Sequence, residues 1–258
     1  MIDKLSVSLI QAPIILEKKE TNLSIFFSLI NQIGSTDIIL LPEMFNTGFC
    51  IRATHLAESM NGKTIKWMKN IVKKKQCAIA GTLMIKENNK IYNRLIWISK
   101  NEKIFKYDKR HLFSLMNEDK HLNAGKERLI VNENGWNICP LVCYDLRFPV
   151  FSRNNVDYDL LIFLANWPSK RIDAWDTLLK ARSIENQCIT IGLNRTSESH
   201  DQIEYNGHSA VYDNFGNKIF YAGESKEKVE TIILNKDSIN KQRKKLNFLN
   251  DRDEFIIL

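Results

Sequence analysis

Two continuous apolar runs constrain the fold of this chain more than any other feature. They read DIILLP at 37–42 and DLLIFLAN at 159–166. A strand that is apolar on both sides must be covered on both faces, which happens mainly in parallel sheets whose strands are connected through helices. The sequence therefore predicts an α/β fold with strands alternating with helices.

The remaining segments also alternate between predicted strands and predicted helices. The start, MIDKLSVSLIQAP, predicts a first strand with Leu5, Val7 and Leu9 on one side. Further strands are expected at 77–85, 92–99, 103–110, 188–194, 208–213, 217–222 and 229–234, with a hairpin over 127–144 that turns at Asn134-Gly135. A first helix is expected from Asn22, as its N-cap, to about Ile33. A short helix is expected at FPVFSRN, and further helices at 63–75, at 170–187 and from about 236.

The layering follows from the need to cover apolar sheet faces. A sandwich of helix, sheet, sheet and helix buries all of them, so we expect a four-layer α-β-β-α arrangement. The 258 residues contain no repeat and no Pro/Gly/Ser-rich linker. Residues 1–258 are therefore predicted to form a single domain, with a C-terminal helix and tail from about 236.

Composition argues against several classes of protein. The net charge of +7 is partly carried by Lys73–Lys75 and KQRKK at 241–245, but neither cluster alternates with aromatic residues as a nucleic-acid surface would. No run is long enough to span a membrane, and the first residues do not form a signal peptide. Five cysteines without regular spacing favour a reducing cytoplasm. We therefore expect a cytoplasmic protein with no nucleic-acid or membrane partner.

Cys143 lies in NICPLVCYDLRFP, residues 137–149, at the end of an apolar run. It can be interpreted as a packed core thiol, as half of a metal pair with Cys139, or as a nucleophile. A thiol has a pKa near ~8.5, so a nucleophilic cysteine needs a base or a positive field. Acyl transfer also needs a group that holds the developing oxyanion.

Three charged residues follow or lie near predicted strand ends and could supply these functions. They are Glu43 in LLPEMF, Lys109 in KYDKRHLF and Glu118 in MNEDKHLNAG. Pro42 keeps the preceding residue extended, so that the strand delivers Glu43 at the sheet edge. Taken singly, each is better explained as solvated surface charge, since most charged residues lie on the surface.

Taken together, these segments resemble the nitrilase, or carbon–nitrogen hydrolase, superfamily. Its marks are a Glu after strand-Leu-Pro, a Lys in Tyr-x-Lys-x-His-Leu, and a Cys in Cys-Tyr-Asp-x-Arg-Phe-Pro, and all three occur here in the family's order. The resemblance extends over nearly the whole chain, including ANWP at 165–168, KARSIENQ at 180–187 and GLNR at 192–195.

The resemblance implies a nitrilase-like four-layer sandwich, a homodimer and a cofactor-free site. It implies Cys143 as nucleophile, Glu43 as general base and Lys109 as oxyanion stabiliser, with Glu118, seven residues before Gly125, in support. Because no two further ligands stand near residues 139–143, no metal is expected.

The flanking motifs are most similar to those of the omega-amidases, which hydrolyse the terminal amide of 2-oxoglutaramate or 2-oxosuccinamate. Such a small-molecule substrate carries a remote carboxylate, for which Arg147 and Arg171 are candidates; Arg147 is equally explained by a structural ion pair. The other substrate-binding candidates are the backbone N–H of Tyr144 and the pocket walls Phe113, Met116 and Trp167, which are also interpretable as core residues. His111 is expected to support the lysine loop.

Two alternatives remain open at this stage. The same site could act on an N-carbamoyl amino acid, another small amide or a nitrile, or the chain could be a catalytically silent scaffold of the family. Where relatives commonly have Gly-Asp-Ser, this chain has Gly207-His208-Ser209, preceded by a loop of its own, SESHDQIEY at 197–205. If that region lines the pocket, the substrate preference is expected to differ.

Overall fold

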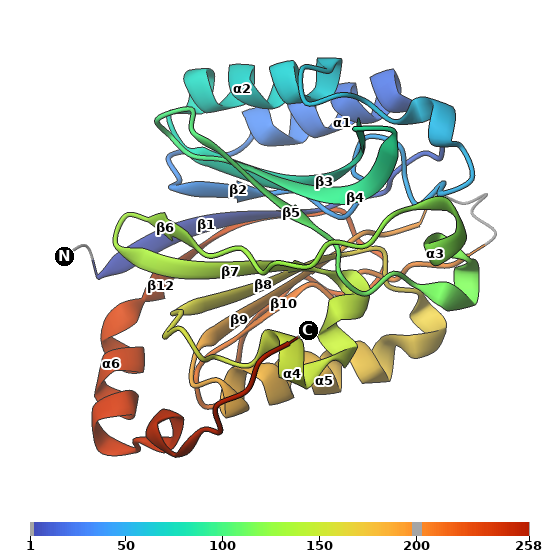
Figure 1. The fold of residues 1–258 in the computed structure, drawn as a ribbon. Coiled ribbons are helices and arrows are strands. Elements are labelled where there is room, and N and C mark those ends of the chain that lie inside the picture. Colours follow the sequence, from blue (N-terminus) through green and yellow to red (C-terminus); the bar gives the residue numbers. More distant parts are fainter. Residues whose placement is uncertain (1–2, 198–202, 258) are drawn as a thin grey trace.

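Two six-stranded sheets pack face to face in the middle of the protein, with helices on both outer sides (Figure 1). The computed structural model describes residues 3–197 and 203–257. The first sheet has the order β12 (Lys228–Asn235), β1 (Lys4–Gln11), β2 (Ile38–Leu40), β3 (Ala78–Glu87), β4 (Lys90–Ile98) and β5 (Ile104–Asp108). The second has the order β11 (Lys218–Tyr221), β10 (Ala210–Tyr212), β9 (Ile189–Asn194), β8 (Leu160–Ala165), β7 (Trp136–Val142) and β6 (Val131–Glu133).

The helices cover the outer faces of these sheets. In Figure 1, α1 (Lys19–Asn31) and α2 (Lys63–Lys75) lie over the first sheet, and α4 (Pro149–Ser152) and α5 (Ile172–Glu185) lie over the second. α3 (Glu118–His121) is a short helix at one end of the sandwich, and α6 (Lys236–Lys245) follows β12 at the other. Short 3₁₀ segments occur at Thr54–Leu56, Ser114–Met116, Cys143–Arg147, Ser169–Arg171 and Phe248–Asp251.

The apolar run at β2 shows why the layers form. Its alternate side chains point in opposite directions: Ile38 and Leu40 join the cluster between the two sheets, and Ile39 joins the cluster beneath α1 and α2. All three residues are fully buried. Each such aliphatic side chain contributes about 1.5–3 kcal/mol of transfer free energy. Parallel pairing of β2 with β1 and β3, and of β8 with β7 and β9, confirms the predicted buried strands.

The predicted hairpin and first strand are also present. Asn134 and Gly135 both have positive φ, +50° and +81°, as a two-residue hairpin turn requires. Its strands, β6 and β7, are shorter than the 127–144 segment predicted, and β10 is likewise shorter than 208–213. Leu5, Val7 and Leu9 face the cluster between the sheets, as the alternation predicted.

The prediction that Asn22 caps the first helix is wrong. The helix begins at Lys19, with Lys18 at the N-cap position, so Asn22 lies inside its first turns. The Asn22 side chain instead accepts a hydrogen bond from Ile15 N and donates to the carbonyl oxygens of Ile15 and Asn46. The Asn22 side-chain amide therefore bonds to residues outside the helix instead of capping the helix N-terminus.

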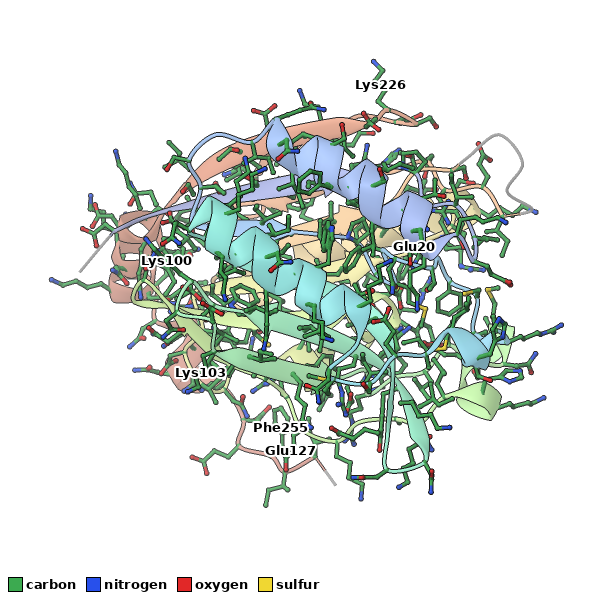
Figure 2. All side chains as sticks on the ribbon, turned by 90° about the horizontal axis from the view of Figure 1, so that it is seen from above. Glu20, Lys100, Lys103, Glu127, Lys226 and Phe255 are labelled. Carbon is green, nitrogen blue, oxygen red and sulfur yellow. The ribbon has the colours of Figure 1, made fainter. Side chains whose placement is uncertain are left out.

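The basic clusters lie at helix ends. Lys73–Lys75 form the last turn of α2, and Arg243 and Lys244–Lys245 the last turn of α6, where cations complement the helix dipole. Figure 2 shows other lysines, among them Lys100 and Lys226, projecting outward from separate parts of the surface. Within residues 3–197 and 203–257, no helix has the length and apolar character needed to cross a membrane.

Candidate active site

Three strand ends bring the singled-out residues to one end of the sandwich. Glu43 lies three residues after β2, Lys109 directly after β5 and Cys143 directly after β7. All three are buried: Glu43 is 0% exposed, Lys109 1% and Cys143 9%. Because burying a charge is costly without partners, the charged members must be paired.

Glu43 is held by four hydrogen bonds. Its Oε1 accepts from Asn93 Nδ2 at 2.7 Å and from Lys109 Nζ at 3.0 Å. Its Oε2 accepts from the backbone N–H of Asn166 at 2.8 Å and from Asn166 Nδ2 at 3.3 Å. The carboxylate is therefore fixed in one orientation by residues from three different segments.

Lys109 lies between two carboxylates. Its Nζ is 3.0 Å from Glu43 Oε1 and 2.9 Å from Glu118 Oε2. Burial alone would lower the pKa of Lys109, but the charges of Glu118 and Glu43 outweigh it and raise the pKa above its ordinary value. The side chain is thus an ammonium at neutral pH. An ammonium has three N–H donors, and here Nζ donates to Glu43 Oε1 and to both oxygens of Glu118, with the longest of the three contacts, 3.2 Å, to Glu118 Oε1.

Glu118 is the first residue of α3 and completes this buried group. Its Oε2 accepts from Phe113 N at 2.6 Å and its Oε1 from Asn93 Nδ2 at 3.1 Å. Burial raises the pKa of Glu118, Lys109 opposes this effect, and Glu43 adds to it. Asn93, on β4, therefore donates to both carboxylates and keeps them on either side of the lysine.

Cys143 lies on a tight turn from β7 into the 3₁₀ segment Cys143–Arg147. Its φ of +45° is rare for a residue with a side chain and marks local strain. Its Sγ is 3.8 Å from the carbonyl oxygen of Asn166. Burial and the charge of Glu43 raise the pKa of the thiol well above its ordinary value, against the opposing effect of Lys109. The sulfur is therefore a neutral thiol at rest and needs a base when it reacts.

Asn166 connects the acid and the thiol. It directly follows β8, and it donates to Glu43 from both its backbone and side-chain nitrogens while its carbonyl oxygen contacts Cys143. Glu43 and Cys143, which lie 100 positions apart in the sequence, are therefore bound to the same residue.

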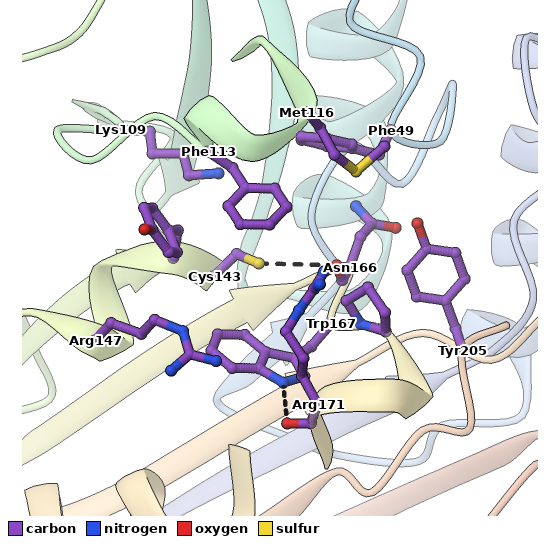
Figure 3. A pocket seen from close by; sticks show the side chains of 12 residues that line it. Phe49, Lys109, Phe113, Met116, Cys143, Arg147, Asn166, Trp167, Arg171 and Tyr205 are labelled. Atoms are coloured by element: carbon purple, nitrogen blue, oxygen red, sulfur yellow. Dashed lines mark hydrogen bonds between the residues drawn. The ribbon is translucent and has the colours of Figure 1, made fainter. Parts of the chain in front are cut away.

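A pocket of about 380 Å³, including its open mouth, lies in front of this group (Figure 3). This is the size of a small-molecule site. It is lined by Phe49, Lys109, Phe113, Met116, Cys143, Tyr144, Arg147, Asn166, Trp167, Pro168, Arg171 and Tyr205. Five of these twelve residues are aromatic, and the charged ones are all cations.

The structure brings together all ten residues that the sequence nominated. Lys109, Cys143 and the six predicted binding residues line the pocket. Glu43 and Glu118 do not line the pocket; they are fully buried and contact the Lys109 ammonium.

Both arginines reach into the pocket, and the guanidinium of each lies over an aromatic ring (Figure 3). The Arg147 guanidinium lies 4.9 Å from the Trp167 ring centre, and that of Arg171 lies 5.0 Å from the Phe113 ring centre. In the described part of the chain, neither guanidinium forms an ion pair. The structural ion pair considered for Arg147 is therefore not found there.

Sequence reasoning missed several residues of the site. Asn93 was visible as a polar residue beside Arg94 in the strand predicted at 92–99, and Asn166 stands in the quoted ANWP segment, but neither was given a role. Phe49, Pro168 and Tyr205 also line the pocket. In the region 197–209, where this chain differs from its relatives, Tyr205 lines the pocket, whereas Gly207, His208 and Ser209 do not. Residues 198–202 of the SESHDQIEY loop lie outside the described residues.

The other cysteines differ from Cys143 in their surroundings. Cys139 is fully buried between the sheets, and burial raises its pKa to about 12, as it does for Cys77 and Cys188. Cys50 is half-buried. The described residues contain no group of three potential metal ligands. Of the five cysteines, Cys143 alone lines the pocket described above.

Two histidines have partners that the sequence did not specify. His111 contacts Asp145 through its Nδ1 at 2.8 Å, consistent with the support expected for the lysine loop. His208 lies between Asp176 and Glu224, at 2.9 and 3.1 Å, away from the pocket.

Gly125→Ala is expected to disturb the segment that carries Lys109. The N–H of Gly125 donates to the Lys109 carbonyl at 3.0 Å, and a Cβ at position 125 would lie 2.1 Å from the carbonyl oxygen of Asp108. We expect the free energy of unfolding in urea to fall by about 2 kcal/mol or more. Gly34→Ala is the control, because nothing lies within 4 Å of that Cβ position. Equal stability of the two variants would contradict the close approach.

The chain matches known proteins over most of its length. The sequence profile of the family described as carbon-nitrogen hydrolase matches residues 6–244. The omega-amidase YafV of Yersinia enterocolitica is 37% identical, covering 98% of this chain and 99% of that protein. The 2-oxoglutaramate amidase of Bacillus subtilis (strain 168) is 35% identical, covering 72% of this chain and 74% of its own.

A solved structure agrees with the fold. A CN-hydrolase superfamily protein from Xanthomonas campestris, whose crystal structure holds an arsenic adduct in the active site, has a TM-score of 0.95 to this chain. It is 37% identical and covers 98% of this chain and 99% of its own. The predicted nitrilase-like α/β fold is thereby confirmed. The chain belongs to the carbon–nitrogen hydrolase family.

Proposed function

We propose that this protein is a cysteine-dependent omega-amidase, which hydrolyses the terminal amide of 2-oxoglutaramate or 2-oxosuccinamate to the 2-oxo diacid and ammonia. The observation that carries the proposal is the pocket itself, where Cys143 and the Lys109 ammonium share one cavity and Glu43 contacts that ammonium and shares Asn166 with Cys143. The similarity to omega-amidase YafV and to a 2-oxoglutaramate amidase supports the choice of substrate.

In the first half of the reaction, Cys143 is acylated. Glu43 takes the thiol proton as Sγ forms a bond to the amide carbon, and the carbonyl π electrons move onto oxygen. The Lys109 ammonium and the Tyr144 N–H hold this oxyanion. The carbon–nitrogen bond then breaks, Glu43 gives its proton to the nitrogen, and ammonia leaves a thioester on Cys143.

In the second half, water releases the acid. Glu43 removes a proton from the attacking water, the carbon–oxygen bond forms, and Lys109 again holds the oxyanion. The carbon–sulfur bond breaks and the thiolate regains its proton. Glu118 takes a supporting role, because its charge helps to keep Lys109 protonated and in place.

The Lys109 side chain suits this role better than an arginine would. An ammonium is a compact point charge, whereas a guanidinium presents a planar fork that matches carboxylates. By the same reasoning, Arg147 and Arg171 suit the remote carboxylate of the substrate. Phe113, Met116 and Trp167 then form the apolar walls along its carbon chain.

Replacing either arginine is expected to weaken discrimination for the charged substrate. For Arg147→Ala and Arg171→Ala, we expect kcat/KM for 2-oxoglutaramate to fall by about 10–100-fold, mainly through KM. For butyramide, which lacks the carboxylate, kcat/KM should change by less than about threefold. Lys170→Ala is the control for general surface charge, since Lys170 is exposed beside Arg171. An unchanged ratio between the two substrates in both arginine variants would contradict the assignment.

The function itself is tested by measuring ammonia release. The panel contains 2-oxoglutaramate, glutamine, a nitrile and an N-carbamoyl amino acid. The proposal expects the first to give the highest kcat/KM. Turnover of the carbamoyl acid alone would indicate a different substrate for the same site, and no turnover of any compound would favour a catalytically silent scaffold.

We also propose that the protein is a cytoplasmic homodimer. Support for the compartment comes from the five free cysteines, and support for the dimer from the family resemblance. Light scattering should give twice the chain mass of 30.1 kDa. A mass of one chain would overturn the dimer, and fractionation of cells would test the compartment.

A further inference from the structure

Asp145 lies two residues after Cys143 and is fully buried. Its carboxylate accepts four hydrogen bonds. Oδ2 accepts from the Tyr107 hydroxyl at 2.7 Å and from the Val142 N–H at 3.0 Å. Oδ1 accepts from His111 N at 3.1 Å and lies 2.8 Å from His111 Nδ1.

These contacts are symmetric about the lysine of the active site. Tyr107 stands two residues before Lys109 and His111 two residues after it. One carboxylate next to the nucleophile therefore holds the lysine segment on both sides. An ionised carboxylate offers about four lone-pair sites, and here all four are in use.

We propose that Asp145, Tyr107 and His111 form a clamp that sets the position of the Lys109 ammonium relative to the Cys143 sulfur. The proposal rests on the roles given above to Cys143 and Lys109. The three clamp residues are positioning residues, since none of them lines the pocket.

The surroundings make the clamp rigid. The His111 ring stacks on Phe148 with 3.7 Å between ring centres and meets Phe151 edge-on at 5.2 Å. The Tyr107 ring also stacks on Phe151, with 6.2 Å between ring centres. Burial and the charge of Asp145 raise the pKa of Tyr107 well above its ordinary value, so the hydroxyl keeps its proton and donates it.

The clamp acts on one step of the chemistry more than on others. An ammonium that moves by about 1 Å loses much of its hold on a developing oxyanion, at a cost of about 100-fold in rate. Alkylation of the thiol generates no oxyanion, and the effect of Lys109 on the thiol pKa is common to both reactions. The ratio of acylation to alkylation at Cys143 therefore reports the position of Lys109 and is independent of the physiological substrate.

The experiment measures both reactions on the full-length protein. Acylation uses p-nitrophenyl acetate: Sγ bonds to the ester carbon, the thiol proton goes to Glu43, and p-nitrophenolate leaves with the bonding electrons. Alkylation uses iodoacetamide, where iodide leaves. For Tyr107→Phe and His111→Ala, we expect the ratio of acylation rate to alkylation rate to fall by about tenfold or more. Cys143→Ala supplies the background for both.

Rescue and control variants separate positioning from stability. His111→Asn keeps a donor nitrogen at the same branch as Nδ1, so its ratio should return to within about threefold of wild type. Tyr158→Phe removes another buried tyrosine hydroxyl, which donates to Ser152 O away from the site, and should leave the ratio unchanged. In the double variant of Tyr107 and His111, the losses should be less than multiplicative if the two act through one carboxylate.

Three results would overturn the clamp: an unchanged ratio in both single variants, an equal fall in Tyr158→Phe, or alkylation slowed as much as acylation. Asp145→Asn should show the largest fall, and if it does not fold, the Tyr107 and His111 variants still decide. The proposed function fails separately, when the wild-type protein releases no ammonia from any compound of the panel.

Discussion

Cys143→Ala is expected to abolish hydrolysis of 2-oxoglutaramate while the fold remains intact. Without the sulfur no thioester forms. Glu43 and Lys109 alone supply only a general base and an oxyanion-stabilising charge. We expect kcat to fall by at least about 10⁴-fold, as for the loss of other covalent nucleophiles. The change in unfolding free energy should stay within about 1 kcal/mol, since the substitution removes one atom from the edge of a pocket.

Cys139→Ala is the matched control. Its thiol lies four residues earlier on β7 and is fully buried between the sheets. We expect it to cost about 1 kcal/mol or more of stability through the small cavity, with kcat unchanged within about twofold. Turnover of Cys143→Ala above about a hundredth of wild type would contradict the assignment of the nucleophile.

Lys109→Met is expected to produce the second largest loss. Methionine keeps the length of the side chain but removes the ammonium that holds the oxyanion in both halves of the reaction. We expect kcat to fall by about 10²–10³-fold or more, whereas Lys106→Ala, at an exposed position on β5, the strand that precedes Lys109, should stay within about twofold. Near-normal turnover of Lys109→Met would refute its role.

The same substitution should make stability depend on pH. Without Lys109, the carboxylates of Glu43 and Glu118 are buried together without a cation, so a proton is retained in the folded state more strongly than in the unfolded state. A carboxyl whose folded pKa lies above its unfolded pKa stabilises the protein at low pH and loses that contribution as the pH rises. The destabilisation measured in urea should therefore be smaller near about pH 5 than near about pH 8.

The positions of the catalytic candidates could be predicted locally, but their roles followed only from the resemblance of the three motifs, taken together, to the carbon–nitrogen hydrolases. Glu43, Lys109 and Cys143 each stand where a recognisable strand ends, and the ends of such strands meet at the edge of an α/β sheet. The buried runs at β2 and β8 likewise required cover on both faces, which fixed the layers. These are properties that a few adjacent residues determine.

The remaining features depend on partners that are distant in the sequence. Asn22 has the chemistry of an N-cap, but Ile15 and Asn46 use its amide inside the helix. Asn93 and Asn166 acquire their roles only when the sheets bring both to Glu43. Neither the periodicity of apolar residues nor the spacing of motifs in the sequence predicts such contacts. The hairpin strands β6 and β7 are also shorter than predicted, because pairing between strands, rather than residue type, decides where a strand ends.

The most direct test of the central claim follows Cys143 during turnover. The wild-type protein is mixed with 2-oxoglutaramate, quenched with acid over milliseconds to seconds, and the peptide that contains Cys143 is analysed by mass spectrometry. We predict a 2-oxoglutaryl thioester on Cys143, and loss of turnover in proportion to prior alkylation of that thiol by iodoacetamide. An adduct on another residue, or full ammonia release after complete alkylation of Cys143, would contradict the account.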